Sequence, residues 1–436
     1  MNMKKSCLIV IALSLLSCAS MSAQNVMSEE YCRVWDSLRP TIEDNIEKYR
    51  KADGEIVLKN VKPGTEVTIE QVSHEFIFGS NIFLYDHFDS AEMNEKYLAP
   101  FGSLFNSATV AFYWKKLEIE KGKPRYAADS PFEYRRPATD PVVDFCESRG
   151  IHMKGHALIY GIRSWGHPEW MSEDRKVMEK EFEAHIKEIG KRYKGRIHNW
   201  DVVNECLDQA NRGIMPDDYT YKSYRWAMKY FPKNVTFNTN ECNLRYDITK
   251  IRRYVEIVRD LVDRGAKIDY MGVQMHIFKP YATRDIAAGN FGIYSPSEFY
   301  DKLYVMSEAE RPIFVSEVTI SVPTDSDSDR EIQMNVAKDY YRLWFSHPSV
   351  VGITWWNLAD GGAVAGEPSY SGLFDADMNP KPSYYALEQL INHEWKTKLA
   401  LTPDSNGKIS WRGFKGTYRI SWTDPKGQTH SEEYIL

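Results

Sequence analysis

Short hydrophobic runs alternate with amphipathic stretches through the middle of the chain. The runs predict eight strands, at residues 76–80, 108–113, 151–158, 197–205, 235–240, 269–276, 312–317 and 350–356. Between them, stretches such as 173–195 and 250–265 have the period of an amphipathic helix and end in a glycine. Eight strand–helix units with right-handed crossovers predict a closed (β/α)8 barrel. An open doubly wound sheet is the alternative, although no GxGxxG turn follows the first strand.

Both ends of the chain have a different pattern. Residues 29–50 have helical periodicity, which Pro40 is expected to break, and 54–72 alternate as strands around a turn at Pro63-Gly64. The tail after residue 396 consists of short alternating runs separated by glycine turns. Because so few strands are marginal alone, we expect the two ends to pair into one small β-sandwich-like module. The expected boundaries are 24–74 for the N-terminal helix and strands, 75–395 for the barrel and 396–436 for the C-terminal strands.

Composition limits the class of protein. With 43% hydrophobic and 27% charged residues among 436, the chain is typical of a soluble globular protein. A net charge of −6 and the lack of a basic run argue against a nucleic-acid partner. The aromatic content of 13% fits either core packing or platforms for sugar rings. We expect a monomer.

The first 23 residues have the pattern of a secretory signal peptide, in which Lys4 and Lys5 precede an apolar stretch and then small residues. Export is therefore expected. The sequence LLSC, ending at Cys18, resembles a bacterial lipobox and would give a lipid anchor, whereas cleavage after Ala23 would release the protein. A secreted, periplasmic or outer-membrane lipoprotein location stays open.

The cysteines after the leader do not predict a metal site. Cys32, Cys146, Cys206 and Cys242 have no CxxC spacing, and the histidines are not clustered. Cys206 and Cys242 each follow a predicted strand end, so a disulfide between them and free thiols are both open.

Polar residues gather at the carboxyl ends of four predicted strands. These residues are Glu205 on the fourth strand, Asn240 on the fifth, His276 on the sixth and Glu317 on the seventh. In a barrel these ends converge on one pocket. Cleavage of a glycosidic bond needs two carboxyl groups, one that protonates the leaving oxygen and one that attacks or stabilises the carbon. A structural ion pair would explain either glutamate alone, but the pair with its amide and imidazole neighbours favours catalysis.

These residues lie in sequences that resemble family 10 of the glycoside hydrolases, the retaining endo-β-1,4-xylanases. HNWDVVNE, ending at Glu205, resembles the family's acid/base strand, and PIFVSEVTI, around Glu317, resembles its nucleophile strand. KGHAL, TFNTNECN, GVQMH and PKPSYYAL are similar to further motifs of the family, in the family's order, between Phe76 and Leu387.

The resemblance implies a role for each matched residue. Glu205 would be the general acid/base, with a raised pKa, and Glu317 the nucleophile, with a lowered pKa. Asn204 would bind a sugar hydroxyl, while His276 and Gln274 would hold the nucleophile in place. The remaining positions implied to bind substrate are His156, Trp356, Trp114 and Asn240, although core packing is the alternative for His156 and Trp356. The implied substrate is a β-1,4-linked plant cell-wall polysaccharide such as xylan, cleaved by double displacement without a metal or organic cofactor.

Several positions depart from the family's pattern. Ala111 and Phe112 are apolar where polar side chains usually hold sugars, and Gly161 replaces a second sugar-binding histidine. Thr319 replaces an aspartate that pairs with the sixth-strand histidine, and Asn357 replaces a glycine. A site with fewer partners for sugar hydroxyls discriminates less between sugars. A different β-linked polysaccharide, or a non-catalytic glycan-binding protein, therefore stays an alternative.

Overall fold

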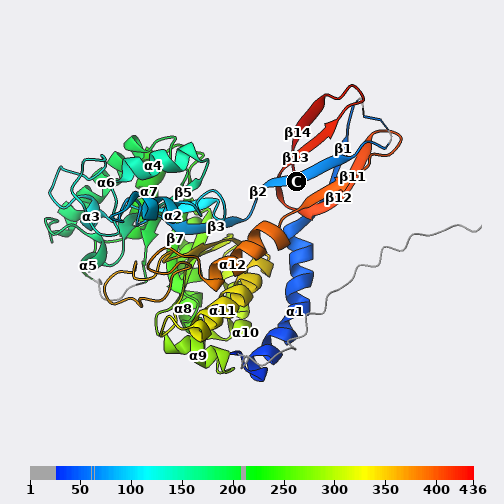
Figure 1. Ribbon diagram of the computed structural model, residues 1–436. Helices are drawn as coiled ribbons and strands as arrows, with labels where there is room; N and C mark the ends of the chain where they lie inside the picture. The colour runs from blue at the N-terminus through cyan, green and yellow to red at the C-terminus, as the bar shows by residue number, and fades with distance from the viewer. Residues whose placement is uncertain (1–25, 60, 63, 208–212) are drawn as a thin grey trace, which may run out of the picture.

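The computed structural model of the protein describes residues 26–436 except 60, 63 and 208–212, and it leaves out the side chain of Cys242. Its centre is a closed barrel of eight parallel strands in the order β10-β3-β4-β5-β6-β7-β8-β9 (Figure 1). The strands are β3 (Ile77–Asn81), β4 (Ser107–Ala111), β5 (His152–Tyr160), β6 (Asn199–Asn204), β7 (Thr236–Asn243), β8 (Tyr270–Ile277), β9 (Ile313–Ile320) and β10 (Val350–Trp355). Each overlaps a predicted run, and the predicted (β/α)8 barrel is confirmed.

Helices between the strands cover the barrel. Segment 173–195, expected to be helical, contains α6, and segment 250–265 overlaps α8, which begins two residues earlier. Asp174 and Asp247 cap the two helices by accepting backbone N–H bonds of 2.8–3.2 Å. None of the described helices is long and apolar enough to cross a membrane. The helices after α1 are α2 (Ala91–Leu98), α3 (Trp114–Leu117), α4 (Thr139–Ser148), α5 (Arg163–Gly166), α6 (Arg175–Arg192), α7 (Tyr219–Tyr230), α8 (Ile248–Asp263), α9 (Tyr281–Ala287), η1 (Gly292–Tyr294), α10 (Pro296–Ser307), α11 (Asp327–Ser346), α12 (Pro382–Glu388) and η2 (Gln389–Glu394).

The first helix, α1 (Glu29–Arg50), is continuous over 22 residues, so the predicted break at Pro40 is wrong. Pro40 lies on the exposed side of the helix, where water can bind the carbonyl group that loses its N–H partner. The opposite side carries the buried residues Trp35 and Ile42 and packs against α11, to which the Tyr31 hydroxyl donates a 2.7 Å hydrogen bond at Asp339. Burial of this face holds the helix together despite the proline.

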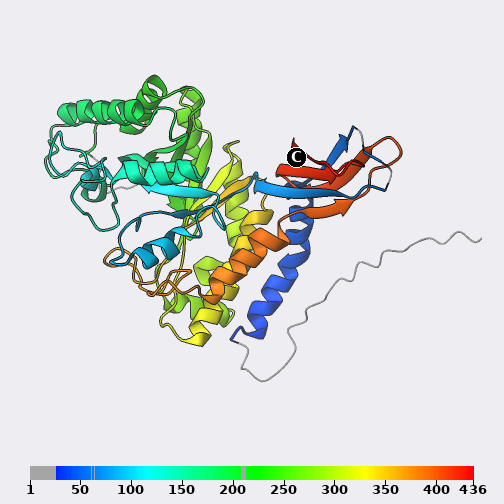
Figure 2. The same cartoon turned by 45° about the horizontal axis from the view of Figure 1, so that its top comes forward.

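The two ends of the chain form one β-module beside the barrel (Figures 1 and 2). β1 (Lys51–Val57) pairs with β12 (Lys408–Phe414), and β2 (Val67–His74) lies between β11 (Lys398–Leu401) and β13 (Gly416–Thr423), with β14 (Thr429–Ile435) at the edge. The predicted pairing of the two flanks is therefore confirmed. Its core contains Trp411 and Trp422, each only 6% exposed, so these rings pack inside the module and are not exposed sugar platforms.

Three expectations fall outside the part of the chain that the structure describes. The predicted leader with Cys18, and Pro63 of the predicted turn, are not among the described residues. Cys206 carries a free thiol, while the side chain of its suggested partner, Cys242, is not described.

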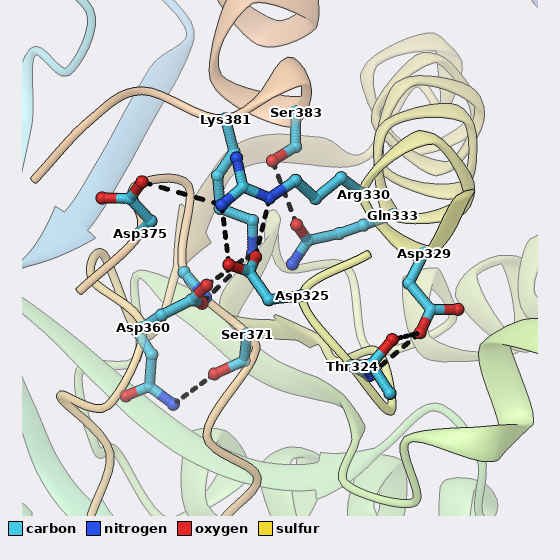
Figure 3. A network of polar contacts seen from close by, with 12 residues as sticks. Thr324, Asp325, Asp329, Arg330, Gln333, Asp360, Ser371, Asp375, Lys381 and Ser383 are labelled. Atoms are coloured by element: carbon cyan, nitrogen blue, oxygen red, sulfur yellow. Dashed lines mark hydrogen bonds and ion pairs between the residues drawn. The ribbon is translucent and has the colours of Figure 1, made fainter. Parts of the chain in front are cut away.

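A buried ion pair fixes the segment that follows β10 (Figure 3). Lys381 Nζ lies 2.9 Å from Asp360 Oδ2, and the two side chains are 0% and 3% exposed. Asp360 also accepts a 2.7 Å bond from the backbone N–H of Gly372. Beside them, Arg330 on α11 makes two 2.7 Å bonds to Asp325. This network joins the segment after β10 to α11 and to the start of α12, and so supports one side of the barrel mouth.

Lys381→Met is expected to lower the free energy of unfolding by about 3–5 kcal/mol, because it leaves the Asp360 carboxylate buried without its cation. Lys398→Met is the control, since Lys398 pairs with Glu70 at the surface and its loss should cost less than about 1 kcal/mol. Urea titrations measure both. Burial raises the pKa of Asp360 although Lys381 opposes this effect, so removal of Lys381 raises that pKa further. As the pH falls and the carboxyl group takes a proton, the variant therefore gains more stability than the wild type, and the deficit should shrink. Equal losses in the two variants would contradict the buried pair.

Candidate active site

The two predicted catalytic glutamates lie at the same end of the barrel. Asn204 ends β6, and Glu205 follows it in a left-handed conformation with φ of 57°, its backbone N–H donating 2.8 Å to the Asn240 carbonyl. Glu317 lies on β9 and is 5% exposed. The Gln274 side chain, from β8 between them, donates to both: Nε2 lies 3.2 Å from Glu205 Oε1 and 3.4 Å from Glu317 Oε1. One amide group therefore holds the two carboxyl groups face to face.

Glu317 is surrounded by hydrogen-bond donors from neighbouring strands. Asn240 Nδ2 lies 2.6 Å from Oε1, and His276 Nε2 lies 3.3 Å from Oε2. Asn240 is itself oriented, because it donates 2.8 Å to Asn204 Oδ1 and accepts from the Ser316 hydroxyl. Donors to the ionised form of a carboxyl group favour that form. The site is therefore arranged to hold Glu317 as a carboxylate.

His276 bonds a hydroxyl group where the family's pattern has a carboxylate. Its Nδ1 lies 2.9 Å from Thr319 Oγ1. Burial lowers the pKa of His276 to about 4, and a neutral threonine does not offset that effect as an aspartate would. The imidazole is then neutral at pH 7, with Nδ1 accepting from Thr319 and Nε2–H donating to Glu317.

His156 and Trp356 lie on the β3–β5 side of the two glutamates, Glu205 and Glu317. His156 Nδ1 lies 2.7 Å from Asp201 Oδ2 and its Nε2 lies 3.1 Å from the Tyr113 hydroxyl. Trp356 packs edge-on against His156 and His276, at ring-centroid distances of 5.6 and 6.3 Å. Both residues are buried, so each supports the wall of the site as well as facing it.

Trp114 does not belong to the site, which corrects its interpretation as a substrate-binding residue. Its ring stacks on His185 of α6 at 3.9 Å, and its Nε1–H donates 2.7 Å to Glu118. Its ring also lies 6.2 Å from that of Phe182, so the side chain packs against α6 and not against the two glutamates. The sequence resemblance matched the position of Trp114, but it does not specify the direction of the side chain.

Two further residues belong to the site and were missed. The Tyr160 hydroxyl bonds the Glu205 carboxyl group, and the Tyr113 hydroxyl bonds His156. Both follow the pattern that identified the glutamates, since Tyr160 is the last residue of β5 and Tyr113 lies two residues after β4. With 27 tyrosines in the chain, residue type alone did not distinguish them.

A close backbone contact explains why residue 161 is a glycine. A Cβ atom at this position would lie 2.0 Å from the backbone carbonyl oxygen of Glu205, and the Gly161 N–H donates 2.6 Å to the Asn204 carbonyl. The chain after β5 therefore passes too close to the acid/base strand to carry any side chain here. The residue before it, Tyr160, carries the side chain that bonds Glu205 at this end of β5.

An open cavity of about 350 Å³ adjoins Glu205 on the β7–β8 side of the pair. It is lined by Ile162, Glu205, Leu207, Glu241, Tyr246, Lys250, Arg253 and Gln274. Glu205 and Gln274 are thus accessible to a ligand from this side, while His156 and Trp356 are buried on the other.

Burial raises the pKa of both glutamates, which corrects the expectation of a lowered value for Glu317. For Glu205, repulsion by Glu317 adds to burial, against hydrogen bonds from Gln274 and Tyr160. For Glu317, the effect of burial is opposed by His156, Lys154 and Asn240. Two carboxyl groups this close do not ionise together at low cost. Because Glu317 has more donors, it ionises first and Glu205 keeps the proton.

Asn240→Ala is expected to move the acid limb of the pH–rate profile upward. Removing the 2.6 Å donor destabilises the Glu317 carboxylate, so its pKa rises further and activity is lost at the low-pH side first. A hydrogen bond to a charged group contributes about 1.5–3 kcal/mol, which corresponds to a shift of about 1–2 pH units. The measurement is kcat/KM against pH, with Asn199→Ala at the opposite end of β6 as control. Movement of the alkaline limb alone would contradict the assignment.

Comparisons with known proteins agree with this geometry. The sequence profile of glycosyl hydrolase family 10 matches residues 74–390. Endo-1,4-β-xylanase B of Paenibacillus barcinonensis is 26% identical over 318 residues, covering 65% of this chain and 88% of that protein. A β-1,4-xylanase of Dictyoglomus thermophilum is 26% identical over 284 residues, covering 59% of this chain and 76% of that protein.

The fold is also similar to solved structures. The crystal structure of xylanase 10B from Thermotoga petrophila RKU-1 in complex with xylobiose matches with a TM-score of 0.59 and 21% identity, over 73% of this chain and 95% of that one. At that identity the likeness concerns the fold alone. The profile match, which covers most of the chain and includes both strand-end glutamates, shows that this protein belongs to glycosyl hydrolase family 10.

Proposed function

We propose that the protein hydrolyses β-1,4 linkages in xylan or a related hemicellulose by double displacement, with retention of the anomeric configuration. The observation that carries the proposal is the Gln274 amide that bonds both carboxyl groups at 3.2 and 3.4 Å. Because one nitrogen atom bonds both, the distance between Glu205 Oε1 and Glu317 Oε1 cannot exceed the sum of these two bond lengths. Retaining enzymes need the short separation of about 5–5.5 Å, because no water molecule has to fit between nucleophile and sugar.

The first step uses both protonation states assigned above. Glu317 attacks the anomeric carbon as a carboxylate while Glu205 gives its proton to the glycosidic oxygen, so that the leaving sugar departs and an ester to Glu317 remains. Glu205 is then ionised and takes a proton from water, whose oxygen attacks the same carbon and releases Glu317. Asn204, oriented by Asn240, presents an amide that can both donate to and accept from a sugar hydroxyl.

The choice of xylan is supported by the relatives, which are named endo-1,4-β-xylanase and β-1,4-xylanase. A panel of β-glycans with measurement of new reducing ends tests it, beside Glu317→Gln as the inactive control. The proposal expects release of xylo-oligosaccharides whose first-formed anomer, read by NMR, is β. A first-formed α anomer would contradict double displacement. Affinity for glycans without turnover would instead favour a glycan-binding protein.

We also propose that the protein is exported, from the leader pattern in the first 23 residues. Mass spectrometry of the mature protein distinguishes the two cleavage sites. A lipid-modified Cys18 as the first residue, lost in Cys18→Ala, supports an anchor, whereas a mature chain that begins at Gln24 supports release. A chain that retains its first 23 residues in the cytoplasm would contradict export.

A further inference from the structure

Two adjacent arginines lie close to the site without a role in the mechanism. Arg135 and Arg136 belong to the segment between α3 and α4. The Arg136 guanidinium lies over the ring of Tyr113, 3.7 Å from its centroid, and 5.2 Å from the centroid of Phe83. The Tyr113 ring is 5.7 Å from the ring of Tyr160, whose hydroxyl bonds Glu205. Arg136 is therefore two aromatic rings away from the proposed acid/base.

The pair is held rigidly against the loop that follows β10. Arg136 Nη1 donates 2.8 Å to the Arg135 carbonyl. Arg135 is 2% exposed, and its Nη1 donates 2.9 Å to Asn357 Oδ1. Asn357 is oriented in turn by a 3.1 Å bond to Glu367 Oε2. Asn357, which replaces the family's glycine, thus anchors the segment that carries Arg136.

Neither guanidinium forms an ion pair with a described residue. Glu133 is paired elsewhere, 2.8 Å from Lys116 Nζ, and Glu367 accepts from Asn357 and acts on Arg136 through its charge without forming an ion pair. Arg135 Nε is buried and has no hydrogen-bond partner within the described part of the chain. Arginine guanidinium groups are charged at neutral pH, and burial and the neighbouring Arg135 lower the pKa of Arg136 only to about 10. Two unpaired like charges side by side are costly, and an anion would relieve that cost.

The surroundings indicate the kind of anion. Phe83, Ala111 and Trp356 form a buried apolar cluster with Tyr113 against it, so the rings beneath the Arg136 guanidinium offer it no anionic partner. The planar N–H fork of a guanidinium matches a carboxylate better than a neutral hydroxyl. Beside the site of a glycosidase, such a carboxylate would be one carried by a sugar.

We propose that Arg136, backed by Arg135, binds the carboxylate of a uronic acid unit carried by the glycan substrate. The inference rests on the proposed glycosidase function and specifies its substrate class. It also accounts for the apolar residues Ala111 and Phe112: Phe112 packs outward against Tyr193 and Trp200, so charge recognition by Arg136 replaces polar contacts from the end of β4.

The test compares Arg136→Gln with the wild type on two substrates, a uronic acid-bearing xylan and a neutral arabinoxylan. The proposal expects the ratio of kcat/KM values, acidic over neutral, to fall by about 10-fold or more, as for loss of a hydrogen bond to a charged group. Arg136→Lys keeps the charge but loses the forked pair of N–H groups, so its ratio should lie between those of the wild type and Arg136→Gln. Arg149→Gln is the matched control, because Arg149 also lies over a ring, that of Phe145, on an exposed helix end, and its ratio should not change. An equal loss on both substrates would overturn the inference.

A binding measurement tests this inference independently of the proposed hydrolase function. Calorimetry in the Glu317→Gln background measures affinity for uronic acid-bearing and neutral xylo-oligosaccharides without turnover. The expected result is a preference for the acidic ligand that declines in 0.5 M NaCl and is lost in the double variant with Arg136→Gln. Equal affinity for the two ligands would overturn the inference even if the enzyme is active. Absence of hydrolysis by the wild type, with the acidic preference intact, would instead overturn the proposed function alone.

Discussion

Glu317→Gln is expected to lose hydrolysis of every glycan substrate by on the order of 10⁴-fold or more, the size of effect seen when a nucleophile is removed. The amide keeps the shape of the side chain but cannot attack the anomeric carbon. Three donors converge on this carboxylate, from Asn240, Gln274 and His276, so its surroundings serve the ionised form that the variant cannot adopt. Initial rates of reducing-end release measure the loss.

The appropriate control is Asp339→Asn, which also neutralises a buried carboxyl group but lies on α11, bonded to Tyr31 of α1. Its rate should stay within about twofold of the wild type, because surface and core changes away from a site act mainly on stability. The unfolding transition of Glu317→Gln should be as cooperative as that of the wild type. Retention of more than a tenth of the activity by Glu317→Gln would remove the nucleophile assignment.

Glu205→Ala should show a loss that depends on the leaving group. On polysaccharide the expected decrease is about 10²–10⁴-fold, the usual contribution of general acid catalysis. An aryl glycoside with an acidic phenol needs little protonation, so its first step should stay fast. The glycosyl ester on Glu317 should then accumulate, because Glu205 is also the base that activates water. A burst of phenol followed by slow turnover is the expected time course.

The comparison of the two substrates carries the argument for Glu205. Equal losses on polysaccharide and aryl glycoside, without a burst, would assign Glu205 a structural role. Its environment argues against that result, since Glu205 is only partly buried, lines the open cavity and is bonded by Tyr160 and Gln274. Removal of a purely structural carboxyl group here would leave those two donors unpaired and reduce both activities alike.

Much of the fold follows from local pattern. Each barrel strand is a short hydrophobic run, and each intervening helix has an apolar face, as in α8 with its buried Ile251, Val255 and Val258. Such periodicities depend only on neighbours in sequence, and their repetition restricts the topology because parallel strands need right-handed crossovers. The predicted break at Pro40 was wrong because a local rule was overridden by a tertiary contact. A proline disfavours a helix locally, but packing of α1 on α11 decides the outcome.

The two glutamates were likewise predictable, because carboxyl ends of parallel strands meet at one mouth whatever the details. Pattern also predicted that the flanks of the chain would pair, since neither could bury a core alone. It did not predict the contacts that tune the site. The Gln274 bridge, the Thr319–His276 bond and the anchoring of Arg135 by Asn357 each join segments that are distant in sequence.

Those contacts depend on side-chain direction and on distances between separate elements, which local periodicity does not encode. Trp114 packs on His185 of α6, and the pKa of Glu317 rises because the folded barrel buries it more than its donors compensate. The chain's local pattern therefore specifies a barrel with a pair of carboxyl groups at its mouth. Protonation states, the residues that orient the pair and the charge beside the site arise only when β4, β8, β9 and β10 are brought together by packing.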